Sequence, residues 1–151
     1  MGSIANLAGI SLPESSGDKT KLGIEVMKSR QFFSKFGLND DVLVPLMASD
    51  GWDMSSNELS IKEEIYDLDK KKWMREVNPP RLSTPSLQEA HEVFMGLFSV
   101  SQDPKSTFIK ISIDHYSPYI AKEWLDKIII QINNTIRNKD IKKRYYCYLV
   151  N

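Results

Sequence analysis

The chain has 151 residues, which is enough for one domain with a hydrophobic core, and its 41% hydrophobic and 26% charged residues are ordinary for a soluble globular protein. Twenty basic residues balance twenty acidic ones, so the net charge argues against a protein that binds nucleic acid or an anionic membrane with its whole surface. Cys147 is the single cysteine, which excludes an internal disulfide and a zinc site built from several cysteines.

The first 18 residues are small and polar, and their glycine, serine and proline content predicts a flexible lead-in. They lack the basic and apolar regions of a signal peptide. No stretch of the sequence has the roughly 18–20 apolar residues of a membrane span, so we expect a soluble chain without an export signal of its own. A helix is predicted from a cap at Asp18 or Thr20 to about Phe36, where Gly37 ends it.

The next part of the chain gives weaker signals. Residues 40–48 predict a short helix or turn, with Asp40 or Asp41 as its cap and Pro45 limiting its length. Residues 49–80 show little periodicity, and we interpret them as an irregular excursion that two tryptophans pin to the rest of the domain. These tryptophans are Trp52 and Trp73.

A helix and then a hairpin are predicted after residue 80. The helix begins behind a cap at Ser83, Thr84 or Ser86 and runs to about Gly96. Its apolar face consists of Leu87, Ala90, Phe94 and Leu97. The hairpin joins two alternating stretches through the turn "SQDPKST", with Phe98 and Val100 facing one way on the first strand. A shift of one residue would expose the isoleucines that share a face of the second strand, which are Ile109, Ile111 and Ile113.

The last predicted helix starts with Ser117 as its cap and Pro118 at its first position. Its expected buried stripe comprises Ala121, Trp124, Leu125, Ile128, Ile129, Ile132 and Ile136. We expect a seam between sheet and helix made by Ile111, Ile113, Leu125, Ile128 and Ile132. The order of helix, hairpin and helix predicts an α+β fold, in which helices pack on one face of a small sheet that contains an antiparallel hairpin.

The candidates for chemistry are few. His91 and His115 are the two histidines, and neither lies in a pattern that binds metals. His115, where strand gives way to helix, is expected to form local hydrogen bonds near Asp114. The acidic side chains between the tryptophans lie among lysines and are interpreted as a solvated charged face rather than an acid–base pair. They are Glu63, Glu64, Asp67 and Asp69.

The C-terminal sequence combines basic and aromatic residues. Its basic residues are Arg137, Lys139, Lys142, Lys143 and Arg144. Its tyrosines are Tyr145, Tyr146 and Tyr148. Such a combination can stack on and hold single-stranded nucleic acid, but a fraying terminus is the favoured interpretation of a single patch without a supporting motif.

Five parts of the chain, in this order, carry a family resemblance. They are "LAGISLPES" with "KTKLGIEVMKSRQFF", then "LVPLMASDGWD", "KKWMREVNPP", "PSLQEAHEVF" and "SVSQDPKSTFIKISIDHYSPYIAKEWLDKIIIQIN". Over about residues 7–140 the chain resembles the periplasmic region of the Wzz-type chain-length determinants, the polysaccharide co-polymerases of bacterial envelopes. The stretch "MKSRQF" in the first part is similar to a helix that follows the first membrane span of that family.

The resemblance implies an inner-membrane protein with two spanning helices and a periplasmic part that has a membrane-proximal α/β base. It implies homo-oligomeric rings that set the modal chain length of O-antigen, lipopolysaccharide or a related surface polysaccharide. The implied partners are a membrane-embedded polysaccharide polymerase and the nascent polysaccharide, with no nucleic acid. Because such proteins are regulators rather than enzymes, we expect no catalytic, cofactor-binding or metal-binding residues.

The expected organisation is a lead-in over residues 1–18, a family-like base domain over residues 19–140 and an atypical tail over residues 141–151. The family's spanning helices have no counterpart in this sequence, so we interpret the chain as truncated at both ends. One alternative is the periplasmic domain of an exopolysaccharide tyrosine autokinase, whose phosphate-binding loop would lie beyond this sequence. The other is a small nucleic-acid-binding module that uses the basic tail.

Overall fold

The computed structural model describes the backbone of residues 16–106 and 108–149, and the side chains of residue 17 and of residues 19–106 and 108–139. The helices within these ranges are α1 (Ser16–Lys28), α2 (Arg30–Ser34), α3 (Asp40–Ala48), α4 (Leu87–Leu97) and α5 (Pro118–Leu149). The strands are β1 (Ser49–Asp53), β2 (Glu58–Ile61), β3 (Tyr66–Asp67), β4 (Lys72–Trp73), β5 (Phe98–Gln102) and β6 (Ile109–Ile113). They pair as three antiparallel two-stranded sheets, β1–β2, β3–β4 and β5–β6, so the predicted α+β fold class is confirmed.

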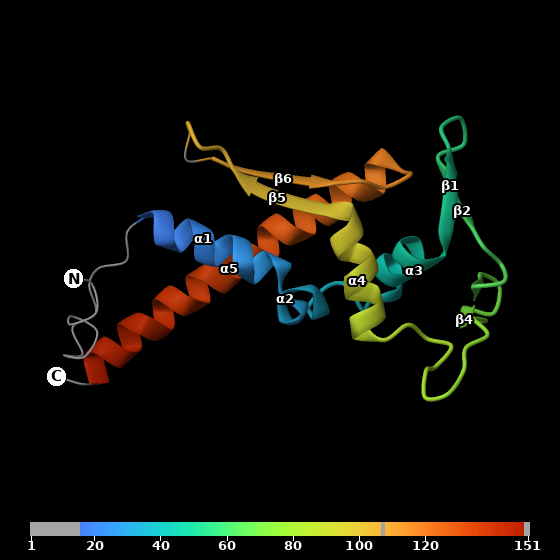
Figure 1. The fold of residues 1–151 in the computed structure, drawn as a ribbon, viewed down its shortest axis with the longest axis horizontal. Coiled ribbons are helices and arrows are strands. Elements are labelled where there is room, and N and C mark those ends of the chain that lie inside the picture. Colours follow the sequence, from blue (N-terminus) through green and yellow to red (C-terminus); the bar gives the residue numbers. More distant parts are fainter. Residues whose placement is uncertain (1–15, 107, 150–151) are drawn as a thin grey trace.

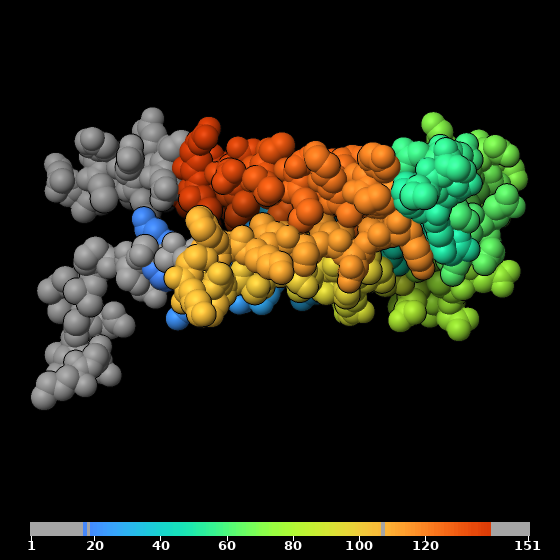
Figure 2. Space-filling model, turned by 90° about the horizontal axis from the view of Figure 1, so that it is seen from above, coloured from blue at the N-terminus to red at the C-terminus, as the bar shows by residue number. Residues whose placement is uncertain are grey.

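The molecule is elongated. The hairpin β5–β6 and helix α5 run side by side along its length, while β1 to β4 gather at one end (Figure 1, Figure 2). Helices α1 and α5 lie against each other at the opposite end, and α4 crosses between them and α3 (Figure 1). The helices therefore connect the predicted hairpin β5–β6 to the short strands β1 to β4, which the sequence did not predict.

The predicted single helix ending near Phe36 is wrong, because Ser29 divides it into α1 and α2. The Ser29 hydroxyl donates to the Val26 carbonyl at 2.7 Å and accepts from the Phe32 amide at 3.2 Å, so it caps the new helix. The bend brings Phe32 and Phe33 into the core, where they are 3% and 0% exposed. Burial of two large aromatic side chains on the short second helix is the gain that favours the break.

The start of α1 also corrects two expectations. Because α1 begins at Ser16, Asp18 and Thr20 lie inside the helix rather than at its cap. The predicted lead-in over residues 1–18 therefore overlaps the helix, and its residues 1–15 lie outside the described part of the chain.

Helix α3 forms in spite of Pro45, as the short helix predicted for residues 40–48. Its N-cap position is held by Asn39, so the predicted caps Asp40 and Asp41 are wrong and occupy the first turn. Proline removes one helical hydrogen bond. Burial of most of the helix's apolar side chains offsets that loss, and these are Val42, Leu43, Val44, Leu46 and Ala48.

The interpretation of residues 49–80 as an irregular excursion is wrong for β1 to β4, which are only two to five residues long. Strands this short carry too few positions for an alternating pattern to be recognised. Trp73 is pinned as expected, since it is 8% exposed and packs edge-on against Tyr66 with ring centroids 4.9 Å apart. Trp52 is half-buried, and its indole nitrogen donates to the Asn57 side chain at 2.9 Å across the β1–β2 turn. Its ring also lies 6.1 Å from that of Tyr119 in α5, a contact that links it to the rest of the domain.

Helix α4 begins as predicted at one of the three proposed caps, Ser86, and ends one residue beyond Gly96. The predicted apolar face turns inward, with Ala90 and Phe94 at 0% and 1% exposure and the flanking leucines half-buried. Phe94 stacks on Phe98 at 5.1 Å and lies 4.9 Å from Phe33, so α2, α4 and β5 meet in one aromatic cluster.

The hairpin and the start of the last helix are confirmed, although Ile109, the first of the three isoleucines on β6, is 39% exposed. Strands β5 and β6 pair with Phe98 opposite Ile113 and Val100 opposite Ile111. The Ser117 hydroxyl accepts from the Ile120 amide at 3.3 Å at the start of α5. In the predicted seam, Ile111 and Ile113 pack on the core, Leu125 is half-buried, and Ile128 and Ile132 are buried.

The buried stripe of α5 is narrower than expected. Trp124, Ile128 and Ile132 are buried at intervals of four residues, whereas Ile129 and Ile136 are 45% and 46% exposed. A two-stranded hairpin covers only one side of a helix, so the neighbouring rows of side chains remain at the surface. The prediction that Ile129 and Ile136 belong to the buried stripe is therefore wrong.

Candidate functional site

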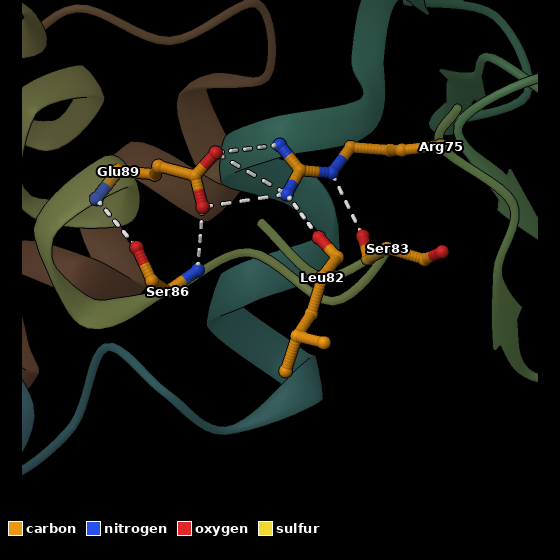
Figure 3. A network of polar contacts seen from close by, with 5 residues as sticks. All are labelled: Arg75, Leu82, Ser83, Ser86 and Glu89. Atoms are coloured by element: carbon orange, nitrogen blue, oxygen red, sulfur yellow. Dashed lines mark hydrogen bonds and ion pairs between the residues drawn. The ribbon is translucent and has the colours of Figure 1, made fainter. Parts of the chain in front are cut away.

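The most extensive polar network of the described residues surrounds Arg75, which lies two residues after β4. Its Nε donates to the Ser83 carbonyl at 2.8 Å and its Nη2 donates to the Leu82 carbonyl at 3.1 Å. Its Nη1 lies 3.3 Å from a carboxylate oxygen of Glu89 in α4 (Figure 3). The two charged side chains are only 16% and 20% exposed, so solvent screens this ion pair less than a fully exposed one.

Glu89 also completes a capping box at the start of α4 (Figure 3). The Ser86 amide donates to its carboxylate at 2.8 Å, and the Glu89 amide donates to the Ser86 hydroxyl at 3.2 Å. These contacts, first the Ser86 amide and then Arg75, lower the pKa of Glu89 from 4.5 to about 2. Glu89 is therefore ionised at neutral pH. Through Ser86 and Arg75 it links the loop that precedes α4 to the helix.

A hollow of about 540 Å³ lies beside this network. Its wall is formed by the loop and the first two turns of α4, and its lining residues are Pro80, Arg81, Leu82, Thr84, Pro85, Ser86, Gln88, Glu89 and Glu92. At its rim the Gln88 side-chain amide donates to Glu92 at 3.4 Å. The hollow has the size of a small-molecule site, about 300–1,000 Å³, and it presents hydrogen-bonding groups with the exposed Leu82 beside them.

His115 forms the local hydrogen bonds expected of it, and also contacts a distant segment. Its Nδ1 accepts from the Ser117 amide at 3.1 Å, which leaves Nε2 to donate to the Pro45 carbonyl at 3.2 Å. Ser49 lies 3.5 Å from the same Nε2, and the ring packs edge-on against Trp124 at 4.9 Å. The histidine therefore joins the end of α3 to the start of α5.

The other candidate side chains are not brought together. His91 lies 2.8 Å from the Lys28 carbonyl through its Nε2, at the end of α1. Glu63, Glu64 and Asp69 are exposed, as a solvated charged face requires. The half-buried Asp67 accepts from the Lys70 amide at 2.9 Å, and this bond, with the Lys70 ammonium at 3.2 Å, lowers its pKa.

The basic and aromatic tail lies mostly outside the described side chains. Helix α5 continues to Leu149, so residues 137–149 extend a regular helix. Arg137 and Lys139 are exposed on it. The nucleic-acid reading of the remaining basic residues and tyrosines stays a prediction.

Sequence reasoning missed the Arg75–Glu89 network. The signal that could have found half of it is the spacing of Ser86 and Glu89, which matches the Ser-x-x-Glu capping box. Arg75 stands 14 residues from Glu89 in a segment without periodicity, so no local pattern connects the two.

The described residues contain no group of three or more histidine, cysteine or acidic side chains that could hold a metal ion. Of the helices in the described ranges, none is sufficiently long and apolar to cross a bilayer. Comparisons with protein-family models, with curated proteins and with solved structures find nothing that matches this chain.

Proposed function

We propose that this chain is the periplasmic, membrane-proximal base of a non-enzymatic regulator of surface polysaccharide chain length. The polysaccharide class is O-antigen, lipopolysaccharide or a related surface polymer. The proposal starts from the resemblance of residues 7–140 to the Wzz-type chain-length determinants. Its partners are further copies of the chain, a membrane-embedded polymerase and the nascent polysaccharide.

One observation carries the proposal. Each of the five resembling parts of the chain contributes a buried side chain to the same hydrophobic cluster. In chain order these side chains are Phe33, Leu43, Trp73, Phe94 and Trp124. A resemblance spread over about 130 residues gains weight when its parts fold as one unit, and this supports the interpretation of residues 19–140 as a single base domain.

The described architecture suits a scaffold. Helix α5 has 32 residues and is therefore about 48 Å long, and its first turns are fixed by the hairpin and by His115. In the proposed assembly the packed base sets the position of this rod relative to neighbouring subunits. The side chains of Arg75, Glu89, His91 and His115 take part in hydrogen bonds within the fold, and the proposed role assigns them no chemical step.

Complementation tests the proposal. The chain, flanked by two supplied spanning helices, is expressed in a bacterium that lacks its own length regulator, and the lipopolysaccharide is resolved by gel electrophoresis. We expect a modal band distribution to return. The control carries Ile128→Asp, which places a charge at a fully buried position and should leave the ladder unregulated. A folded, membrane-inserted chain that leaves the ladder unchanged would count against the proposed function.

A further inference from the structure

A second hollow, of about 320 Å³, lies between the bend of α1 and α2 and the later turns of α5. Its floor is apolar and consists of Val26 and Phe32. Its polar lining residues are Ser29, Gln31, Lys35, Thr135, Asn138 and Lys139. Because two stretches of chain about 100 residues apart, 26–35 and 135–139, line it together, the hollow is a product of the packing of α1 and α2 near α5 rather than of one helix surface (Figure 1).

The charge of this hollow is one-sided. Lys35, at the C-cap of α2, and Lys139, in α5, both line it, and none of the described lining residues carries a carboxylate. Neither lysine forms an ion pair with another described residue. Like charges that face a common hollow without a counter-ion favour an anionic ligand in that space.

The uncharged polar groups divide into two kinds. The Ser29 and Thr135 hydroxyls already donate to the carbonyls of Val26 and Gln131, at 2.7 and 2.8 Å, and they help to hold the walls. The amides of Gln31 and Asn138 are exposed, and no hydrogen bond to a described residue occupies them. The two lysines and these two amides therefore offer donors toward the same ligand.

We propose that this hollow binds a phosphate group. A phosphate monoester carries nearly two negative charges and three acceptor oxygens, so it can accept from two ammonium groups and an amide at once. Lysine binds phosphate as a point charge and needs no fixed planar geometry, which suits two exposed side chains. The apolar floor accommodates the carbon skeleton next to the phosphate. This inference stands independently of the proposed function.

The test is an NMR titration of the full chain with sodium phosphate and with glycerol phosphate, against sodium chloride at matched ionic strength. We expect amide shifts at Gln31, Lys35, Asn138 and Lys139. The double variant Lys35→Gln with Lys139→Gln should weaken the apparent affinity about five- to tenfold. The control removes two exposed lysines at the other end of the molecule, Lys71→Gln in the β3–β4 turn with Lys72→Gln at the start of β4, and should bind like the parent chain.

Two further arms identify the source of the phosphate. Co-sedimentation with phosphatidylglycerol vesicles is compared with co-sedimentation with phosphatidylcholine vesicles. Preferential binding to phosphatidylglycerol that disappears in the lysine double variant identifies a lipid headgroup as the ligand. Acetate reports whether a single carboxylate suffices, and we expect it to bind more weakly than phosphate. The inference is overturned if soluble phosphate does not shift the lining amides and the chain does not co-sediment with phosphatidylglycerol vesicles. It is also overturned if acetate binds with the same affinity as phosphate. The same holds if the control double variant weakens phosphate binding as much as the double variant of Lys35 and Lys139.

Discussion

The ion pair between Arg75 and Glu89 makes a prediction about acid stability. Glu89→Gln removes the charge of this side chain and keeps its shape and its capacity to accept from the Ser86 amide. Because folding lowers the pKa of Glu89 from 4.5 to about 2, the native state holds the carboxylate charged under conditions in which the unfolded chain protonates it. The stabilisation is present above about pH 4.5 and is lost as the pH falls toward 2.

The size of the effect follows from the same two pKa values. A change of this extent corresponds to at most about 3 kcal/mol. The side chains are 16% and 20% exposed, so water screens part of the interaction, and we expect about 1–2 kcal/mol at neutral pH. Glu89→Gln should therefore lower the free energy of unfolding by about that amount near pH 7. The difference between the variant and the parent should vanish near pH 2.

Urea denaturation at a series of pH values between about 7 and 2 measures this directly. The matched control is Glu92→Gln, one turn further along α4, where the carboxylate is exposed and accepts from Gln88 alone among the described residues. This control should leave the pH profile unchanged. Parallel profiles for the parent chain and Glu89→Gln, separated by a constant offset, would refute the assignment of the acid sensitivity to Glu89.

Three further predictions concern packing and hydrogen bonding, each read from urea unfolding. Ile128→Ala should cost about 2–5 kcal/mol because Ile128 is fully buried, while Ile130→Ala, at 62% exposure on the same helix, should change stability by less than about 0.5 kcal/mol. Gly37→Ala should cost about 1–3 kcal/mol, since its Cβ would lie 2.3 Å from the buried Phe33 ring, whereas Gly96→Ala meets nothing and should stabilise α4 by about 0.5–1 kcal/mol. His115→Phe should cost about 1–2 kcal/mol because it removes the hydrogen bonds to Pro45 and Ser117. For each destabilising variant, an unchanged urea midpoint would contradict the packing or hydrogen-bonding role given to that residue.

The sequence predicted the elements that bury one face along a regular period. The hairpin was found because isoleucines alternate on β6, and α5 was found because a Ser-Pro start precedes apolar residues at helical spacing. The width of the stripe on α5 was overestimated, since helical spacing alone does not say how much surface the partner covers. Ile128 and Ile129 are neighbours in sequence, but Ile128 is 0% exposed and Ile129 is 45% exposed, because the hairpin covers only one side of α5.

The parts that were not predicted depend on single side chains and on distant partners. One serine hydroxyl at Ser29 is enough to end a helix and start another, and nothing in the periodicity of residues 16–34 marks that point. The sheet β3–β4 consists of two residues on each strand, too few to show alternation, and the rings of Tyr66 and Trp73 pack against each other across it. The phosphate hollow needs residues 26–35 and 135–139 together, and their proximity follows only from the packing of α1 on α5.

The two histidines show why a chain with little recognisable chemistry still has residues that matter. The last four carbonyls of a helix have no partner within that helix. Lys28 ends α1 and Pro45 lies in the last turn of α3, and each of these carbonyls faces the Nε2 of a histidine from a distant element. His91 and His115 thus supply donors to the ends of α1 and α3 across 63 and 70 residues of sequence, and at α3 the Ser49 hydroxyl donates to the same Pro45 carbonyl. A neutral imidazole suits this role because one ring nitrogen donates to the helix end while, in His115, the other accepts from the Ser117 amide that begins α5. The polar residues that would be tested first as catalysts are therefore residues that join distant helices to each other.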